Sequence, residues 1–146
     1  MQSSFKFKFQ KILEYKETME NLRLADYNKA KEILKSEEKK LKELINYKKN
    51  ELAMRNINVK NTTIFDLKNY SMILGYINKE IAKQETRVDN ARDIVDSKKK
   101  VLLEALKEKK IMEKIKEKHY NEFIYEIKKE EDNLTDEIVN FRSSKN

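Results

Sequence analysis

The chain has 146 residues, of which 40% are charged and 38% hydrophobic, with one Gly, one His and no Pro, Cys or Trp. The length fits one domain, and the scarcity of Gly and Pro excludes the many turns of sandwiches, barrels and βα folds. The lack of Cys excludes disulfides and thiolate zinc sites. The balance of charged and hydrophobic residues is typical of a long helix or coiled coil, whereas the net charge of +7, from 33 basic and 26 acidic residues, raises the question of nucleic-acid or anionic-lipid binding.

The first predicted element is a helix over about residues 9–55. Apolar residues recur in it at spacings of three and four, which places them on one helical face. The first four are Ile12, Tyr15, Met19 and Leu22. The face then continues, with some lapses, as Ala30, Leu34, Leu41, Leu44, Lys48 and Leu52.

A break is predicted at about residues 56–63. Three Asn residues in this stretch tolerate left-handed backbone, and its β-branched residues are poor helix formers. Thr63 followed by Asp66 is typical of an N-cap with an acidic third residue. A second helix is therefore expected to start near residue 64.

The second helix is predicted to run to about residue 141 and has the clearest pattern. One seven-residue series is Leu67, Leu74, Ile81, Val88, Val95, Leu102 and Lys109. Its companion series is Tyr70, Ile77, Gln84, Ala91, Lys98, Ala105 and Met112. Eleven of these fourteen positions are apolar, and a repeat sustained this long predicts a coiled-coil face.

After Met112 the apolar pattern shifts by one residue. It continues as Tyr120, Ile124, Ile127, Glu131, Leu134, Ile138 and Phe141. A short turn near residue 60 predicts an antiparallel hairpin in which residue i faces about residue 119 − i. Helix 1 then runs out opposite about residue 115, and about 26 residues of helix 2 extend beyond it.

The charge distribution changes at the same place. Residues 98–118 contain nine Lys and four Glu, whereas residues 119–141 contain two Lys and seven Asp or Glu. The predicted fold is thus a single all-α domain over residues 1–146, a long antiparallel two-helix coiled-coil hairpin with a protruding C-terminal overhang. The uncovered apolar stripe of the overhang is interpreted as a partner-binding face; a solvated tail or a self-association seam remains the alternative.

Other classes of function find little support in these residues. A two-helix hairpin has no water-excluding pocket, so no catalytic residue, cofactor or metal is expected, and His119 is interpreted as a surface residue. The Lys residues of 98–118 alternate with Glu, which disfavours nucleic-acid binding. Lys6, Lys8 and Lys11 interrupt the apolar stretch near the start, and the longest apolar run is only 72–77, so a cytoplasmic chain is expected.

Several segments together resemble the FliJ family of flagellar export proteins. The opening Phe5-Lys-Phe-Lys-Phe-Gln-Lys-Ile-Leu-Glu-Tyr-Lys is similar to the start of those chains. Leu41-Lys-Glu-Leu-Ile-Asn-Tyr47 resembles their L-x-x-L-I-D-Y segment, and Tyr70 to Ile81 resembles their Y-x-x-F-I-x-x-L-x-x-x-I pattern. Glu113 to Ile138 is similar to their C-terminal part. Ile73, Ile77 and Glu51 depart from residues found in some members.

The resemblance implies a non-catalytic component of flagellar protein export, motility and chemotaxis. Members form an antiparallel two-helix coiled coil like the stalk of the rotary ATPase γ subunit. They associate with the export ATPase FliI, the export-gate protein FlhA and export chaperones. The gate-contacting surface of the family maps to Leu44, Tyr47, Ile73 and Ile77, and the ATPase is expected at the end that holds the termini.

The hypothesis from the sequence is therefore an adaptor between an ATPase ring and a membrane gate. It would associate with the membrane only peripherally, through its partners, and would not bind nucleic acid. On the ATPase side the expected contact residues are Tyr120, Ile124, Ile127, Leu134 and Ile138. The alternatives are a type III secretion or rotary-ATPase central-stalk-like subunit, and a general coiled-coil scaffold or chaperone.

Overall fold

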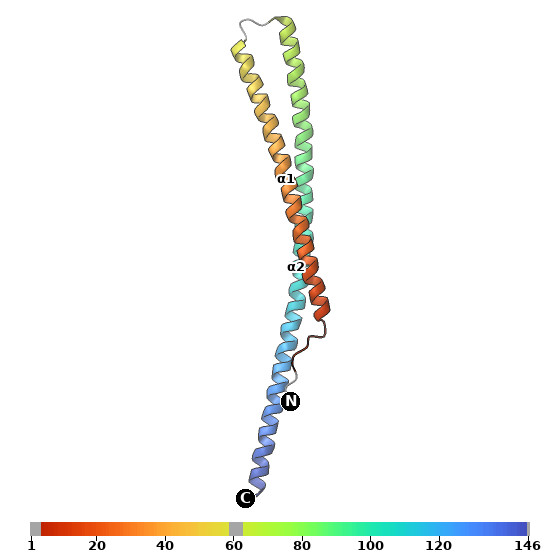
Figure 1. Cartoon of the computed structure of the whole chain (residues 1–146), viewed down its shortest axis with the longest axis vertical. Coiled ribbons are helices and arrows are strands. Elements are labelled where there is room, and N and C mark those ends of the chain that lie inside the picture. The colour runs from red at the N-terminus through yellow and green to blue at the C-terminus, as the bar shows by residue number, and fades with distance from the viewer. Residues whose placement is uncertain (1–3, 59–62, 146) are drawn as a thin grey trace. The chain divides into compact units, whose positions relative to one another are not determined.

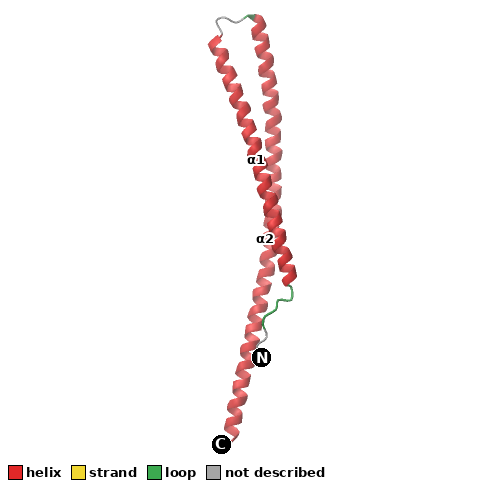
Figure 2. Cartoon of the chain, in the orientation of Figure 1, coloured by secondary structure: helices red, strands yellow, loops and turns green. Residues whose placement is uncertain are grey.

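The computed structural model describes residues 4–58 and 63–145 and contains two helices, α1 (Gln10–Asn58) and α2 (Ile64–Lys145) (Figure 1). Within these ranges no strand occurs, as Figure 2 shows. The all-α expectation and the two-helix hairpin are confirmed. The break expected at 56–63 begins later than predicted, because residues 56–58 belong to α1, and residues 59–62 lie outside the described ranges. Helix α2 continues past the expected end near residue 141.

The chain divides into two compact units. The terminal unit contains residues 1–22 and 103–146, and the central unit contains residues 23–102. Each unit holds one stretch of α1 and one of α2, so each is an antiparallel helix pair with its own seam.

The start of α2 is a capping box. The backbone N–H of Asp66 donates to Thr63 Oγ1 at 3.1 Å, and the backbone N–H of Thr63 donates to Asp66 Oδ2 at 3.4 Å. The N–H of Leu67 also reaches the Thr63 carbonyl at 3.0 Å. These bonds satisfy backbone donors that have no partner within the helix, which confirms the N-cap predicted from the sequence.

The seam of the central unit follows the two predicted seven-residue series of α2. Ile77, Val88 and Ala91 are buried. On α1 Ala30 is buried, and the seam residues one turn to either side, Tyr27 and Leu34, are half-exposed. Leu67 and Lys98 are the members of the series that are exposed instead. A repeat of alternating three- and four-residue steps keeps one stripe against the partner helix, and burial of this stripe from water stabilises the pair.

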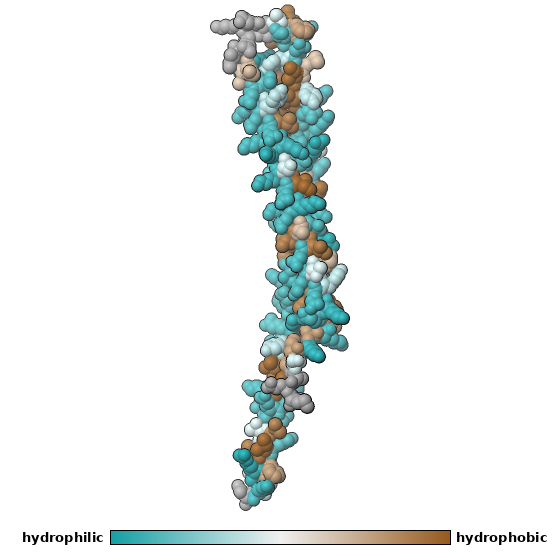
Figure 3. Space-filling model, viewed as in Figure 1, coloured by the Kyte–Doolittle hydropathy of each residue, from teal (hydrophilic) through white to brown (hydrophobic). Residues whose placement is uncertain are grey.

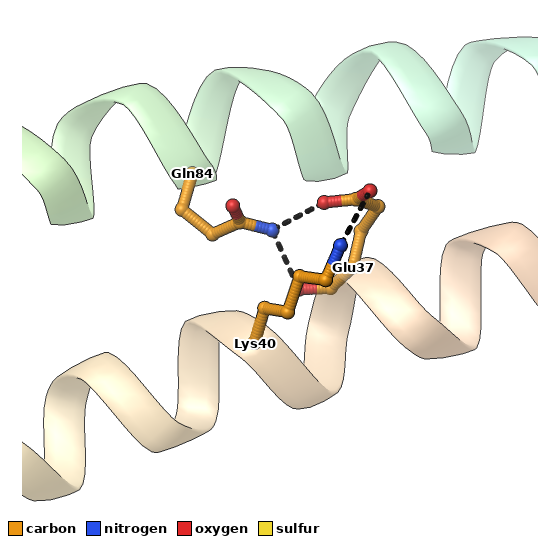
Figure 4. A network of polar contacts seen from close by, with 3 residues as sticks. All are labelled: Glu37, Lys40 and Gln84. Carbon is orange, nitrogen blue, oxygen red and sulfur yellow. Dashed lines mark hydrogen bonds and ion pairs between the residues drawn. The ribbon is translucent and has the colours of Figure 1, made fainter.

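A polar residue interrupts this apolar seam. Gln84 is only 4% exposed, and its amide nitrogen donates to the Glu37 carbonyl oxygen at 2.9 Å and to Glu37 Oε2. Figure 4 shows Gln84 reaching from α2 to Glu37 on α1, whose carboxylate also pairs with Lys40 at 3.7 Å. A satisfied polar residue in a coiled-coil seam favours one register, because any shift would leave its buried amide without partners.

The seam of the terminal unit mixes apolar and charged residues, and Met19, Ala105 and Met112 are half-buried in it. Leu13 is buried, but the neighbouring seam contacts are Lys16 Nζ to Glu108 Oε2 at 3.0 Å, Lys109 to Glu20, and Lys116 Nζ donating to Gln10 Oε1 at 2.9 Å. The hydrogen bond with Glu20 raises the pKa of Lys109, and its desolvation only partly opposes this effect. Lys109 therefore stays charged at neutral pH, and charge complementarity specifies how these stretches of α1 and α2 pair.

The register differs from the expected one. Pairing i with 119 − i would place Glu37 opposite residue 82 and Lys16 opposite residue 103, whereas they contact Gln84 and Glu108. The pairs are thus displaced by two and five residues. Part of the cause is that α1 ends at Asn58 and not near 55, which moves the centre of the hairpin toward the C-terminus.

The apolar stripe expected at the start of helix 1 is wrong. Ile12, Tyr15 and Leu22 are 45%, 59% and 53% exposed, while Leu13 is 3% exposed. Counting back in sevens from Leu34 gives residues 27, 20 and 13, so an uninterrupted helix carries Leu13 into the seam. Ile12, Tyr15 and Leu22 therefore face solvent, whereas Met19, the fourth predicted residue, is half-buried as expected.

The one-residue shift expected after Met112 is also absent from the covered seam. The half-buried positions continue in the same seven-residue phase as Lys116, His119 and Phe123. Two of these residues are polar or titratable, so the apolar residues of the sequence gave no sign of them.

No described helix has an apolar stretch long enough to cross a membrane.

Gly75 offers a direct test of how the helix is stabilised. It lies inside α2, and a Cβ built there meets nothing within 4 Å. Gly75→Ala is expected to raise the free energy of unfolding by about 0.5–1 kcal/mol, because alanine loses less backbone entropy in a helix. Urea denaturation followed by circular dichroism measures the change, and an unchanged or lower midpoint would contradict it.

Gln84→Ala is expected to lower the free energy of unfolding by about 1–3 kcal/mol, because it removes two interhelical hydrogen bonds and leaves the Glu37 groups desolvated. Glu85→Ala is the matched control, since Glu85 is adjacent and exposed; it should change stability by less than about 0.5 kcal/mol. The same denaturation experiment compares them. Equal effects at both positions would show that Gln84 is not a specific interhelical contact.

Candidate partner-binding surfaces

The first candidate surface lies in the central unit, where the sequence predicted a contact with a membrane gate. Tyr47 and Ile73 are 51% and 45% exposed, and Leu44 is half-exposed. Ile77 differs, because it is 3% exposed and packs in the seam. Its side chain is therefore inaccessible to a partner while the helices are paired. Ile77 instead helps to hold together the two helices that carry the exposed residues.

Tyr47 and Ile73 lie on the same side of the helix pair. Each comes directly before a seam residue, Lys48 on α1 and Leu74 on α2. In an antiparallel coiled coil, equivalent flanking positions of the two helices meet on one side. We call Leu44, Tyr47 and Ile73 the loop-side patch.

More apolar residues are exposed close to this patch in the chain. They include large residues near the start of α2 whose side chains are at least 66% exposed: Ile64, Phe65, Met72 and Tyr76. Figure 3 shows hydrophobic side chains gathered on the visible face of this part of α2. Exposed apolar residues gathered this way are typical of protein-interaction sites.

The N-terminal segment forms an aromatic clasp on α2 in the terminal unit. Phe5 packs edge-on against Tyr120, with ring centroids 5.4 Å apart, and contacts Phe123 at 5.5 Å. Phe7 is 8% exposed and packs edge-on against His119 at 5.6 Å. The clasp therefore covers α2 as far as Phe123.

Lysine and backbone contacts complete the clasp. The Lys116 ammonium lies 6.0 Å from the centre of the Phe7 ring, within the range of a cation–π contact. The N–H of Gln10 donates to the Phe7 carbonyl at 3.1 Å, so the extended segment turns directly into α1. His119 is half-buried among these groups and is not the surface residue expected from the sequence.

The second candidate surface is the C-terminal part of α2. We call residues 124–145 the overhang, because the aromatic clasp ends at Phe123. Its exposed apolar side chains include Ile124, Leu134, Ile138 and Phe141, while Ile127 is half-buried. Tyr120, which the sequence placed on the same uncovered stripe, is 47% exposed and contacts Phe5. The free stripe therefore begins at Ile124.

A shallow hollow in the central unit was not predicted. Its floor contains Ala30 and Ala91, the small seam residues of the two helices, with Ile33 and Ile94 beside them. Its full lining is Ala30, Ile33, Glu37, Arg87, Asn90, Ala91 and Ile94. Among the residues that the structure describes, no group of His, Asp or Glu side chains is arranged to hold a metal ion.

The aromatic clasp is the main feature that helical periodicity in the sequence does not indicate. Its signal was the alternation of Phe5, Phe7 and Phe9, because alternate residues of an extended segment point to the same side. The hollow had a weaker signal, two alanines at seam positions, which matters only once the register of the helices is known.

Phe7→Ala is expected to loosen the terminal unit locally. Loss of this buried ring should speed amide hydrogen exchange in residues 10–22 and 112–123 by at least about tenfold, because local opening then costs less free energy. Phe65→Ala removes an exposed ring from the central unit and should leave exchange in those segments unchanged. Mass spectrometry of exchanged peptides measures both, and similar protection in Phe7→Ala and the unmodified chain would contradict the clasp.

Comparison with known proteins places the chain in a family. The family described as "Flagellar FliJ protein" matches residues 5–146, from the aromatic clasp through both helices. No curated protein and no solved structure matches the chain. The match spans well over half of the chain and includes the segments in which the sequence resembled that family.

Proposed function

This chain belongs to the FliJ family of flagellar protein-export components, and we propose that it is a non-catalytic adaptor between the export ATPase FliI and the export-gate protein FlhA. It also handles export chaperones in this proposal. It works at the cytoplasmic side of the membrane and is held there peripherally, through its partners.

The observation that carries the proposal is the presence of two separate apolar surfaces on one helical hairpin. The loop-side patch belongs to the central unit, and the overhang belongs to the terminal unit. A protein that joins two partners needs two surfaces that they can occupy together. The hollow at the start of the overhang, which Tyr125 and Glu126 help to line, is wide open to solvent, whereas catalysis requires a pocket that excludes water.

The gate is assigned to the loop-side patch. Tyr47 and Ile73 are exposed on one side of the helix pair, and large aromatic or aliphatic residues of this kind provide most of the energy of protein interfaces. Leu44 extends the patch toward the seam. Ile77 is left out of this contact because it is buried, although it holds the helices that present the other three.

The ATPase is assigned to the overhang. Ile124, Ile127, Leu134 and Ile138 supply an apolar helix face that can lie in a groove of a larger assembly, one of the recurring modes of helix recognition. Tyr120 stands at the edge of this contact, because Phe5 already covers part of it. A partner that reached Tyr120 would have to displace Phe5 or pack around it.

The two assignments predict that binding to each partner can be lost without loss of binding to the other. Removing residues 124–146 is expected to abolish binding to FliI and to preserve binding to FlhA, because the clasp and both seams remain. Tyr47→Ala combined with Ile73→Ala should weaken FlhA binding by at least about tenfold and leave FliI binding unchanged. Biolayer interferometry with the purified partners measures both affinities.

Tyr15→Ala is the control for the loss of an exposed tyrosine, since Tyr15 is exposed on α1 and belongs to neither surface. It should bind both partners as the unmodified chain does. Loss of both interactions in either variant would contradict the division of the surfaces. Failure of the unmodified chain to bind FliI or FlhA would reject the adaptor role itself.

A further inference from the structure

The apolar stripe of the overhang is bordered by carboxylates on one edge. Glu130 and Glu137 are exposed and seven residues apart, so they lie in one row along the helix. At about 100° per residue this row borders Ile127, Leu134 and Phe141. Glu131 lies within the stripe itself, whereas Asp132 and Asp136 lie away from it. The stripe thus has an acidic edge and an acidic centre between residues 127 and 138. The basic residues Arg142 and Lys145 lie at its C-terminal end, where the Lys145 ammonium is 4.8 Å from the centre of the Phe141 ring.

These carboxylates disfavour a second copy of this chain as the occupant. In an antiparallel pair of overhangs the acidic edge of one copy meets the acidic edge of the other. Glu130 of each copy would then face Glu137 of the other copy, which gives two repulsive pairs. In a parallel pair the two Glu131 side chains would meet within the core. Like charges at flanking or core positions of a coiled coil select against a pairing, so both arrangements are unfavourable.

The same carboxylates favour a basic partner. We propose that the overhang docks on an apolar helix or groove whose rim carries Lys or Arg beside Glu130 and Glu137, with a further basic group at Glu131. The apolar stripe supplies the contact area, while the carboxylates select the partner and its register. The proposal deepens the proposed ATPase contact, on which its biological setting rests, by stating the chemistry of the surface that binds.

The charge along α2 agrees with this proposal. Residues 119–141 carry seven acidic and two basic side chains, although the whole chain has a net charge of +7. The acidic segment is therefore a local exception and not a consequence of overall composition. It overlaps the overhang, which neither α1 nor the aromatic clasp covers in the described structure and which carries six acidic and four basic side chains.

Two synthetic peptides test the chemistry without a natural partner. Both are amphipathic helices with leucine at the apolar positions of each heptad; one carries lysine at the flanking positions and the other glutamate. The full chain is expected to bind the lysine peptide at least about tenfold more tightly than the glutamate peptide at low salt. The difference should shrink at about 0.5 M salt, because screening weakens exposed charge pairs. Fluorescence anisotropy of the labelled peptides measures both.

Two double variants identify the face that is responsible. Glu130→Lys with Glu137→Lys should weaken binding of the lysine peptide by at least about tenfold. Asp132→Lys with Asp136→Lys makes the same change in net charge on another side of the helix and should stay within about twofold of the unmodified chain. Equal losses of affinity in the two variants would show that only net charge matters and would overturn the proposal. Unchanged affinity in both variants would overturn it as well. Circular dichroism verifies that both variants keep their helical content.

The remaining outcomes separate this proposal from the proposed function. If the full chain sediments as a dimer that removal of residues 124–146 converts to a monomer, the occupant is a second copy and the proposal is overturned. If the chain binds the lysine peptide through the Glu130 edge but does not bind FliI, the ATPase assignment is rejected and the basic partner is another protein. If it binds FliI and the Glu130 and Glu137 variant binds FliI equally well, the ATPase contact stands and the basic-rim proposal is rejected.

Discussion

The seven-residue phase of two long helices is the constraint on which the rest of the structure depends. Each helix is continuous over its described range, so the residues that enter the seam at one place dictate which enter it many turns away. This phase brings Leu13 into the seam and leaves Ile12 and Tyr15 outside, although all three are apolar. The surfaces that partners can reach are therefore formed by the residues that lie outside the seam.

Two kinds of contact specify the pairing, one in each unit. In the central unit a buried amide, Gln84, meets both the backbone and the carboxylate of Glu37. In the terminal unit ion pairs such as Lys16 with Glu108 occupy seam positions that apolar residues would otherwise fill. Apolar burial alone tolerates a slipped register, whereas directional polar contacts do not. A hairpin with so narrow an apolar seam therefore uses polar side chains to specify its alignment.

The aromatic clasp divides covered from uncovered surface on α2. Phe5 and Phe7 protect the helix as far as Phe123, and the exposed stripe begins at the next residue. The change of charge lies close to the same boundary. One helix thus has a basic stretch that pairs within the chain and an acidic stretch that remains available to another molecule, which is the arrangement that the proposed adaptor requires.

The sequence by itself determined the fold class, the position of the break, the capping box at Thr63 and the seam of the central unit, because these follow from local propensity and from an unbroken apolar repeat. Only the tertiary structure decided the charged contacts in the seam of the terminal unit and the place of Phe5 and Phe7. The physical reason is that charged seam residues carry no apolar signal, and an extended aromatic segment shows its target only when the opposing helix is in register. Periodicity along one helix identifies candidate faces, but packing against the other helix selects which of them are covered.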